Sequence, residues 1–278
     1  MPLNIGPDFW AARHGWLYQA NGGQPLLVAS LAAFGIFVVY SILQGIFGYV
    51  AYAALNQDWA MQGLAEADGM AKFIKGSIIG LLPAALIGIG LTLLASRIDN
   101  RNGLSGLHLH VPALGAVGWF LVVAGFSVAI MVIYILTFNV LGIDPKDYAP
   151  TGDGNSQSGM IEKALADLAD EPGLFALAIP GVAFAVPVAE EMIFRGAIFS
   201  ALVNSPAGKS GAVLTTAALW AAIHGSTAPW LFVAIIFIMG IVLGLLLLRF
   251  GSLWVTIVCH CVWNGLTTLS IFGGTAGT

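Results

Sequence analysis

Long runs of hydrophobic residues, separated by short polar segments, dominate this chain. A helix that crosses a membrane needs about 20 consecutive, mostly apolar residues. The pattern predicts seven such spans, near residues 25–49, 76–96, 114–142, 173–203, 211–224, 230–249 and 252–272. The fourth run is long enough to be kinked or divided at Pro180 and Pro187, so the count is seven or eight. We therefore expect an all-α, polytopic transmembrane helix bundle.

The composition supports a multi-pass protein of the cell membrane. Of the 278 residues, 58% are hydrophobic and only 9% are charged, whereas soluble proteins carry about 25% charged residues. No basic cluster indicates a nucleic acid as partner. The apolar composition instead indicates that the protein is embedded in the lipid bilayer. Cys259 and Cys261 lie two residues apart in the last run, where a helix turns them away from each other. We expect both cysteines to be buried packing residues.

The sequence divides into an N-terminal segment and one membrane domain. Residues 1–24 contain Trp10, Trp16 and Tyr18, which suit a segment at the membrane interface. Residues 25–272 form the single transmembrane domain that we expect. Residues 143–172 include a short amphipathic helix that is either an interfacial connector or a lid over a cavity. Its apolar side would carry Met160, Ile161, Leu165 and Leu168.

The distribution of cations gives a weak indication of orientation. Cytoplasmic loops of membrane proteins carry an excess of Lys and Arg. A cytoplasmic N-terminus would place five cations inside, namely Arg13, Arg97, Arg101, Lys209 and Arg249. It would place four outside, namely Lys72, Lys75, Lys146 and Lys163.

Three charged residues interrupt the fourth apolar run, in the stretch VAEEMIFRG. An ionised side chain at the centre of a span costs roughly 2.5–3.5 kcal/mol. Glu191 and Arg195 are four residues apart, in the favourable order for an ion pair within one helix. Glu190 points about 100° away from Glu191 and needs a partner from another helix.

Other polar residues inside apolar runs supply candidate partners. His224 ends the fifth run, and the last run carries His260 and Asn264. If these side chains converge with Glu190, they form a polar cavity inside the membrane. Such a set of groups would suit hydrolysis. The carboxylate would act as a base on a water, the imidazoles would hold a metal or stabilise charge, and the amide would bind an oxyanion.

A catalytic zinc ion is one interpretation of this set. Such a site uses three protein ligands, which Glu190, His224 and His260 would provide. The chain lacks the local H-E-x-x-H spacing of zinc proteases, however. A metal-free site, in which Glu190 and a histidine activate water, is the alternative.

The order of these motifs resembles a known family. The chain reads Glu190-Glu191-Met-Ile-Phe-Arg195, then Trp220-Ala-Ala-Ile-His224, then His260-Cys-Val-Trp-Asn264. This order, over about residues 173–272, is similar to that of the CPBP (Abi) intramembrane proteases. These are relatives of the type II CAAX prenyl endopeptidases. One departure is Trp220, where that family more often has Phe.

The resemblance implies a role for each motif residue. Glu190 would activate the attacking water and His224 would assist. His260 and Asn264 would bind a metal or stabilise the oxyanion, and Glu191 and Arg195 would support the site. The implied substrate is a peptide bond near the membrane surface, in a membrane-associated or lipidated protein. The alternatives are a non-catalytic immunity or scaffold protein and, less favoured because no inverted repeat is visible, a proton-coupled transporter.

Overall fold

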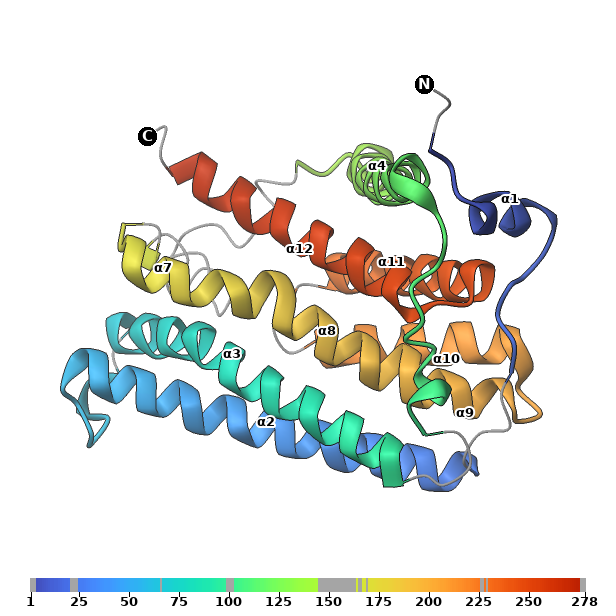
Figure 1. The fold of residues 1–278 in the computed structure, drawn as a ribbon. Coiled ribbons are helices and arrows are strands. Elements are labelled where there is room, and N and C mark those ends of the chain that lie inside the picture. Colours follow the sequence, from blue (N-terminus) through green and yellow to red (C-terminus); the bar gives the residue numbers. More distant parts are fainter. Residues whose placement is uncertain are drawn as a thin grey trace. The chain divides into compact units, whose positions relative to one another are not determined.

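The computed structural model describes residues 4–20, 25–65, 67–98, 103–144, 164, 167–168, 170–225, 228 and 230–275. Within these ranges the chain is helical, with no strand (Figure 1). The principal helices are α1 (Pro7–His14), α2 (Leu26–Asn56), α3 (Ala67–Ile98), α4 (Gly115–Leu141), α7 (Pro172–Ile179), α8 (Val186–Glu191), α9 (Phe199–Val203), α10 (Gly208–Ile223), α11 (Trp230–Phe250) and α12 (Leu253–Thr275). The all-α, polytopic helical fold is therefore confirmed.

The described residues contain six helical segments that are long and apolar enough to cross a membrane. They are Leu26–Asn56, Gly69–Ile98, Gly115–Leu141, Pro172–Val203, Trp230–Phe250 and Leu253–Ser270. The expected span at 211–224 is helix α10, which has only 16 residues. At 1.5 Å per residue it reaches about 24 Å, which is short of the roughly 30 Å hydrocarbon core. Six of the seven predicted spans therefore meet the length of a full span among the described residues, and α10 is shorter than that length.

The prolines of the fourth span do not divide it. Residues 172–203 are helical throughout, but Pro180–Ala185 and Met192–Ile198 are π-helical. In each π-helix the backbone hydrogen bond reaches back five residues, as from the Val186 N–H to the Gly181 carbonyl. Such widened turns occur often at functional sites. Here they lie on either side of α8, the helix that carries Glu190 and Glu191.

The chain forms two compact units, each built from three stretches of sequence. The first comprises Met1–Ile36, Ile89–Leu136 and Glu190–Val262, and the second comprises Phe37–Gly88, Thr137–Ala189 and Trp263–Thr278. Several helices, among them α2, α3 and α12, begin in one unit and end in the other. The boundary of the single transmembrane domain expected at 25–272 stays a prediction.

Close contact between α10 and α11 holds the C-terminal part of the first unit together. A Cβ atom on Gly240 would lie 3.0 Å from the Cα of Ala217, and one on Gly244 would lie 3.3 Å from the Val213 side chain. The two glycines are four residues apart and thus share one face of α11. Their GxxxG spacing is typical of such close helix contacts.

The N-terminal segment packs on the end of α11. The backbone N–H groups of Leu17 and Tyr18 donate to the carbonyls of Arg249 and Leu248, at 3.2 and 3.1 Å. Tyr18 is buried in a core cluster with Phe199 and Leu247. The segment is thus part of the first unit, and its interfacial position in a membrane remains a prediction.

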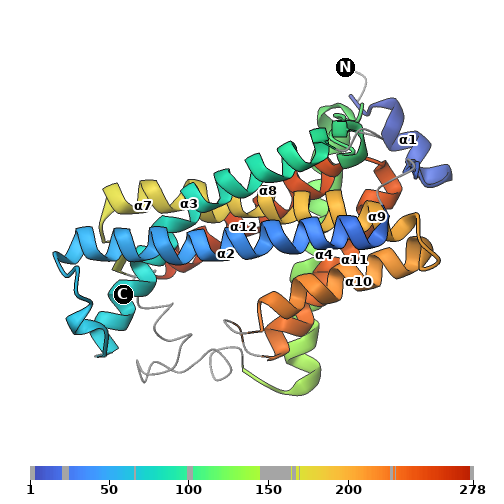
Figure 2. The ribbon, with the colours of Figure 1, turned by 90° about the horizontal axis from the view of Figure 1, so that it is seen from below.

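Close helix contact also builds the second unit, where α2 lies beside α3 (Figure 2). A Cβ atom on Gly80 would lie 2.6 Å from the backbone nitrogen of Gly48. Most of the amphipathic helix expected within residues 143–172 lies outside the described residues, including Met160, Ile161 and Leu165. Both interpretations of this helix, as an interfacial connector or as a lid over a cavity, therefore stay predictions. Three of the cations counted for the orientation also lie outside the described residues, namely Arg101, Lys146 and Lys163.

Candidate active site

Glu191 and Arg195 form the buried ion pair that their spacing predicts. The Nη1 of Arg195 donates to the Oε1 of Glu191 over 2.9 Å, and neither side chain is exposed. The second guanidinium nitrogen, Nη2, donates to the carbonyl of Gly240 over 3.3 Å. The guanidinium carbon lies 4.6 Å from the centre of the Trp220 ring, which adds a cation–π contact. The pair therefore connects the fourth span to α10 and α11.

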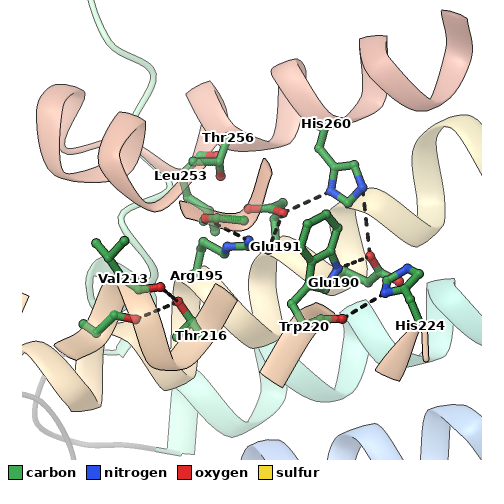
Figure 3. A network of polar contacts seen from close by, with 12 residues as sticks. Glu190, Glu191, Arg195, Val213, Thr216, Trp220, His224, Leu253, Thr256 and His260 are labelled. Carbon is green, nitrogen blue, oxygen red and sulfur yellow. Dashed lines mark hydrogen bonds and ion pairs between the residues drawn. The ribbon is translucent and has the colours of Figure 1, made fainter. Parts of the chain in front are cut away.

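His260 is attached to this pair through its Nδ1 atom, which lies 3.0 Å from the Oε1 of Glu191 (Figure 3). The carboxylate of Glu191 is an acceptor, so Nδ1 carries the proton and Nε2 carries the lone pair. His260 is 2% exposed. Glu191 thus fixes both the ring orientation and the tautomer of His260, as a carboxylate does for a catalytic or metal-binding histidine.

Glu190 lies on the other side of His260. Its Oε2 accepts a hydrogen bond of 2.7 Å from the indole Nε1–H of Trp220. The same oxygen is 4.0 Å from the Nε2 of His260, too far for a direct hydrogen bond. Glu190 therefore has the partner outside its own helix that it requires. That partner is a neutral donor on α10.

His224 stands beside Trp220 at the end of α10. Its Nδ1 lies 2.9 Å from the carbonyl of Trp220, so this nitrogen carries the proton of the neutral ring. The two rings meet edge to face, with centres 5.3 Å apart, and Trp220 meets His260 in the same way at 5.1 Å. Trp220 consequently contacts both imidazoles, the Glu190 carboxylate and the Arg195 guanidinium (Figure 3).

Asn264, the remaining candidate, belongs to the second unit. There its amide Nδ2 donates to the carbonyl of Val182 over 3.2 Å, within the π-helical turn after Pro180. Its predicted role, to bind a metal or stabilise an oxyanion, stays a prediction. Five of the six motif residues thus meet in the first unit: Glu190, Glu191, Arg195, His224 and His260.

The donor types at this site suit zinc, but their arrangement does not. Glu190, His224 and His260 offer one carboxylate and two imidazoles whose Nδ1 atoms are fixed, as in many zinc proteins. Among the described residues, however, no three His, Cys, Asp or Glu side chains are placed so that they could hold one metal ion. Cys259 and Cys261 are both free and buried, as expected of packing residues.

Sequence reasoning did not find two contacts of this site. It noted Trp220 only as a departure from the resembled family, and it did not identify the Gly240 carbonyl as a partner of Arg195. The only signal in the sequence was that Trp stands where the resembled family more often has Phe.

Comparison with known families points in the same direction as the geometry. Residues 172–266 match the model of a family described as type II CAAX prenyl endopeptidase Rce1-like. These residues are similar to that family. The match covers Glu190, Trp220, His224, His260 and Asn264, and it confirms the resemblance found in the sequence. The comparisons with curated proteins and with solved structures returned no match. Together with six apolar helices, this similarity indicates a multi-pass membrane protein.

Proposed function

We propose that this chain is an intramembrane endopeptidase in which Glu190 activates the water that attacks the peptide bond. The observation that carries the proposal is the 4.0 Å separation between Glu190 Oε2 and His260 Nε2. A water oxygen at about 2.8 Å from each atom would bridge that separation. Both atoms are acceptors, so such a water would donate both protons to them. Its lone pairs would then be free to attack a carbonyl carbon.

The chemistry follows from this placement. As the water oxygen attacks, Glu190 takes one proton, and the peptide carbonyl becomes a tetrahedral oxyanion. The proton then passes to the departing amine, and the Glu190 carboxylate is restored. The Trp220 N–H holds the carboxylate oxygen in place at 2.7 Å. Glu191 and Arg195 fix His260 from behind. His224, with Nδ1 bound to a carbonyl, assists from the end of α10.

The substrate class follows from the family and from the membrane. CAAX prenyl endopeptidases act on a bond next to a prenylated cysteine, and this chain is similar to them over residues 172–266. We propose a peptide bond near the membrane surface, in a membrane-anchored or lipidated protein. The protein would reside in the cell membrane.

The proposal is written without a metal, because the described residues include no three His, Cys, Asp or Glu side chains placed to hold one ion. We expect a zinc chelator to leave cleavage unchanged in purified, reconstituted protein. Loss of cleavage that added zinc restores would instead support the zinc alternative, with Glu190, His224 and His260 as ligands.

The decisive experiment compares new peptide termini in host membranes by mass spectrometry. The wild type and Glu190→Gln are expressed at matched levels, and Glu171→Gln, an exposed acid of the second unit, serves as the control. We expect a set of termini with the wild type and with Glu171→Gln that is absent with Glu190→Gln. Identical termini in all three, with all three folded, would overturn the protease proposal in favour of an immunity or scaffold protein.

A further inference from the structure

One end of the first unit carries exposed tryptophans that are paired with arginines. Trp10 and Trp16 are 45% and 49% exposed, although each is large and apolar. The guanidinium carbon of Arg13 lies 5.2 Å from the Trp10 ring, and that of Arg249 lies 5.8 Å from the Trp16 ring. Tryptophan is enriched where membrane helices meet the headgroup region. Arg249 belongs to the last turn of α11, which is itself a candidate span.

The charged residues at this end are mostly cations. Arg97 lies in the last turn of α3 and Lys209 in the first turn of α10, and both are exposed. Outside the candidate active site, the only acidic residue among the described residues of the first unit is Asp8. Its Oδ2 already accepts a hydrogen bond of 2.7 Å from the Ala113 N–H. The surface therefore has an excess of positive charge.

The first unit also has a cavity of about 570 Å³. The N-terminal segment contributes Gln19, the loop after α3 contributes Ser105, His108 and His110, and the turn between α11 and α12 contributes Gly251. The polar side chains of Gln19, Ser105 and His110 are exposed, whereas His108 is 6% exposed. Burial lowers the pKa of His108 to about 4, so it is neutral at physiological pH. The cations that accompany the cavity are therefore arginines.

The cavity is close along the chain to the pair of Arg249 and Trp16, and Arg13 precedes the lining residue Leu17 by four residues. Leu17, which lines it, follows Trp16 directly, and Gly251 follows Arg249 by two residues. The Leu17 N–H also donates to the Arg249 carbonyl, which holds the two segments together. A cavity with hydroxyl, amide and imidazole groups, next to cations at the end of a span, matches a phosphate that carries polar substituents.

We propose that this end of the first unit binds an anionic phospholipid, with the headgroup in the cavity and Arg13 and Arg249 beside its phosphate. The tryptophans then lie at the level of the headgroups. A soluble anion is a poorer match, because two large apolar rings would remain in water when it is bound. A zwitterionic lipid is also a poorer match, because its own cation would face the arginines. The proposal concerns a different site from the candidate active site and does not depend on the proposed protease activity.

The test measures which lipid the purified protein retains. Full-length protein in detergent receives an equimolar mixture of phosphatidylglycerol and phosphatidylcholine with identical acyl chains, and native mass spectrometry counts the bound lipids. The variants are Arg13→Gln, the double variant Arg13→Gln/Arg249→Gln, and Lys72→Gln. Lys72 is an exposed cation of the second unit and provides the matched control.

We expect the wild type and Lys72→Gln to retain phosphatidylglycerol over phosphatidylcholine. Each arginine removed should lower that preference by about fivefold. Arg13→Gln changes an exposed side chain, so it gives a result even where the double variant folds poorly. Equal retention of both lipids by the wild type, or an unchanged preference in Arg13→Gln, would overturn the proposal. Displacement of the lipid by an equal concentration of glycerol phosphate would also overturn it, because the ligand would then be a soluble phosphate.

Discussion

The Glu191–Arg195 pair makes two charged side chains compatible with the interior of a helical membrane protein. Removing one partner leaves the other charge buried, and breaking a buried pair in this way costs about 3–5 kcal/mol. We expect Arg195→Met to lower the free energy of unfolding by an amount of this order. The double variant Glu191→Gln/Arg195→Met should recover much of the loss, because no isolated charge remains. Thermal unfolding in detergent measures both. Wild-type stability of Arg195→Met would show that the pair does not act as a brace.

Trp220 has a role that only a tryptophan can fill. Trp220→Phe retains an aromatic ring under Arg195 but loses the N–H that holds Glu190 Oε2 at 2.7 Å. Because the base is then less well positioned, we expect kcat to fall by about 10–100-fold, with KM and thermal stability nearly unchanged. Trp254→Phe is the matched control. It also removes one indole hydrogen bond, to the Leu109 carbonyl at 2.9 Å, but away from Glu190. Equal losses of kcat in both variants would contradict this role.

His108 should make stability depend on pH. Its pKa falls from 6.5 to about 4 on folding, chiefly because burial disfavours the charged ring and also because of the neighbouring His110. As the pH falls below 6.5, the unfolded chain takes up a proton that the folded chain does not, so stability decreases until about pH 4. The effect is at most about 3 kcal/mol. His108→Asn suits the positive φ of 52° and should flatten this part of the pH profile of the unfolding temperature. Parallel profiles for variant and wild type would contradict the prediction.

At the level of single residues, contacts within one helix could be predicted from the sequence. The Glu191–Arg195 pair is such a case, since residues four apart lie on one face of a helix. The contacts of Trp220 and Gly240 could not be predicted in this way. They depend on how α10 and α11 are rotated against the fourth span, and a period in the sequence does not determine that rotation.

At the level of helices, the contact between α10 and α11 positions the arginine. A Cβ atom on Gly240 would lie 3.0 Å from Ala217 and 3.1 Å from the Nη2 of Arg195, so Gly240→Ala must move both. We expect a loss of about 1–3 kcal/mol in unfolding free energy, together with reduced activity. Gly244→Ala is the control on the same face, where the nearest atoms, at 3.3 Å, belong only to the Val213 side chain. It should cost less and leave activity near the wild-type level. Larger damage from Gly244→Ala would indicate that the arginine contact has little importance.

The helical elements were easier to predict from sequence than their local geometry. Six hydrophobic runs correspond to six candidate spans, because a run of about 20 apolar residues has few alternatives to a transmembrane helix. The seventh run corresponds to α10, which is apolar but has only 16 residues. Hydrophobicity alone does not show that this helix is shorter than the other six. The π-helical turns on either side of Glu190 and Glu191 could not be predicted either, because no periodic pattern in the sequence indicates a π-helix. Pro180 and Pro187 indicated only that the helix would be irregular there.

At the level of the whole molecule, the helices fix which loops emerge on the same side of a membrane. The N-terminal segment is bonded to the end of α11, and the loop after α3 is bonded to the start of α12 through the hydrogen bond from Trp254 to Leu109. These segments therefore share one side, and they carry Arg13, Arg97 and Arg249. Because α2 and α3 are each long and apolar enough to cross a membrane, we expect the loop between them to emerge on the other side. The positive-inside rule then predicts a cytoplasmic N-terminus.

Cysteine labelling in intact cells tests this orientation. The background is low in the variant Cys259→Ser/Cys261→Ser, and both native cysteines are buried in any case. An exposed cysteine is then introduced as Ala11→Cys, Ser210→Cys or Ala60→Cys. We expect a membrane-impermeant maleimide to label Ala60→Cys in intact cells, and to label the other two only after permeabilisation.

The outcome also determines which leaflet the proposed lipid site faces. A cytoplasmic N-terminus places Arg13, Arg249 and the cavity at the inner leaflet, where anionic lipids attract juxtamembrane cations. If Ala11→Cys and Ser210→Cys label in intact cells and Ala60→Cys does not, the N-terminus is outside, and lipid selectivity would have to be explained at the outer leaflet. If Ala11→Cys and Ser210→Cys label on opposite sides, then α10 does not start on the side of the N-terminus, and the side assigned to these segments is wrong. The two arginine–tryptophan pairs can bind an anionic lipid only if they face a leaflet that contains such lipids. The labelling result and the lipid-binding result must therefore indicate the same leaflet.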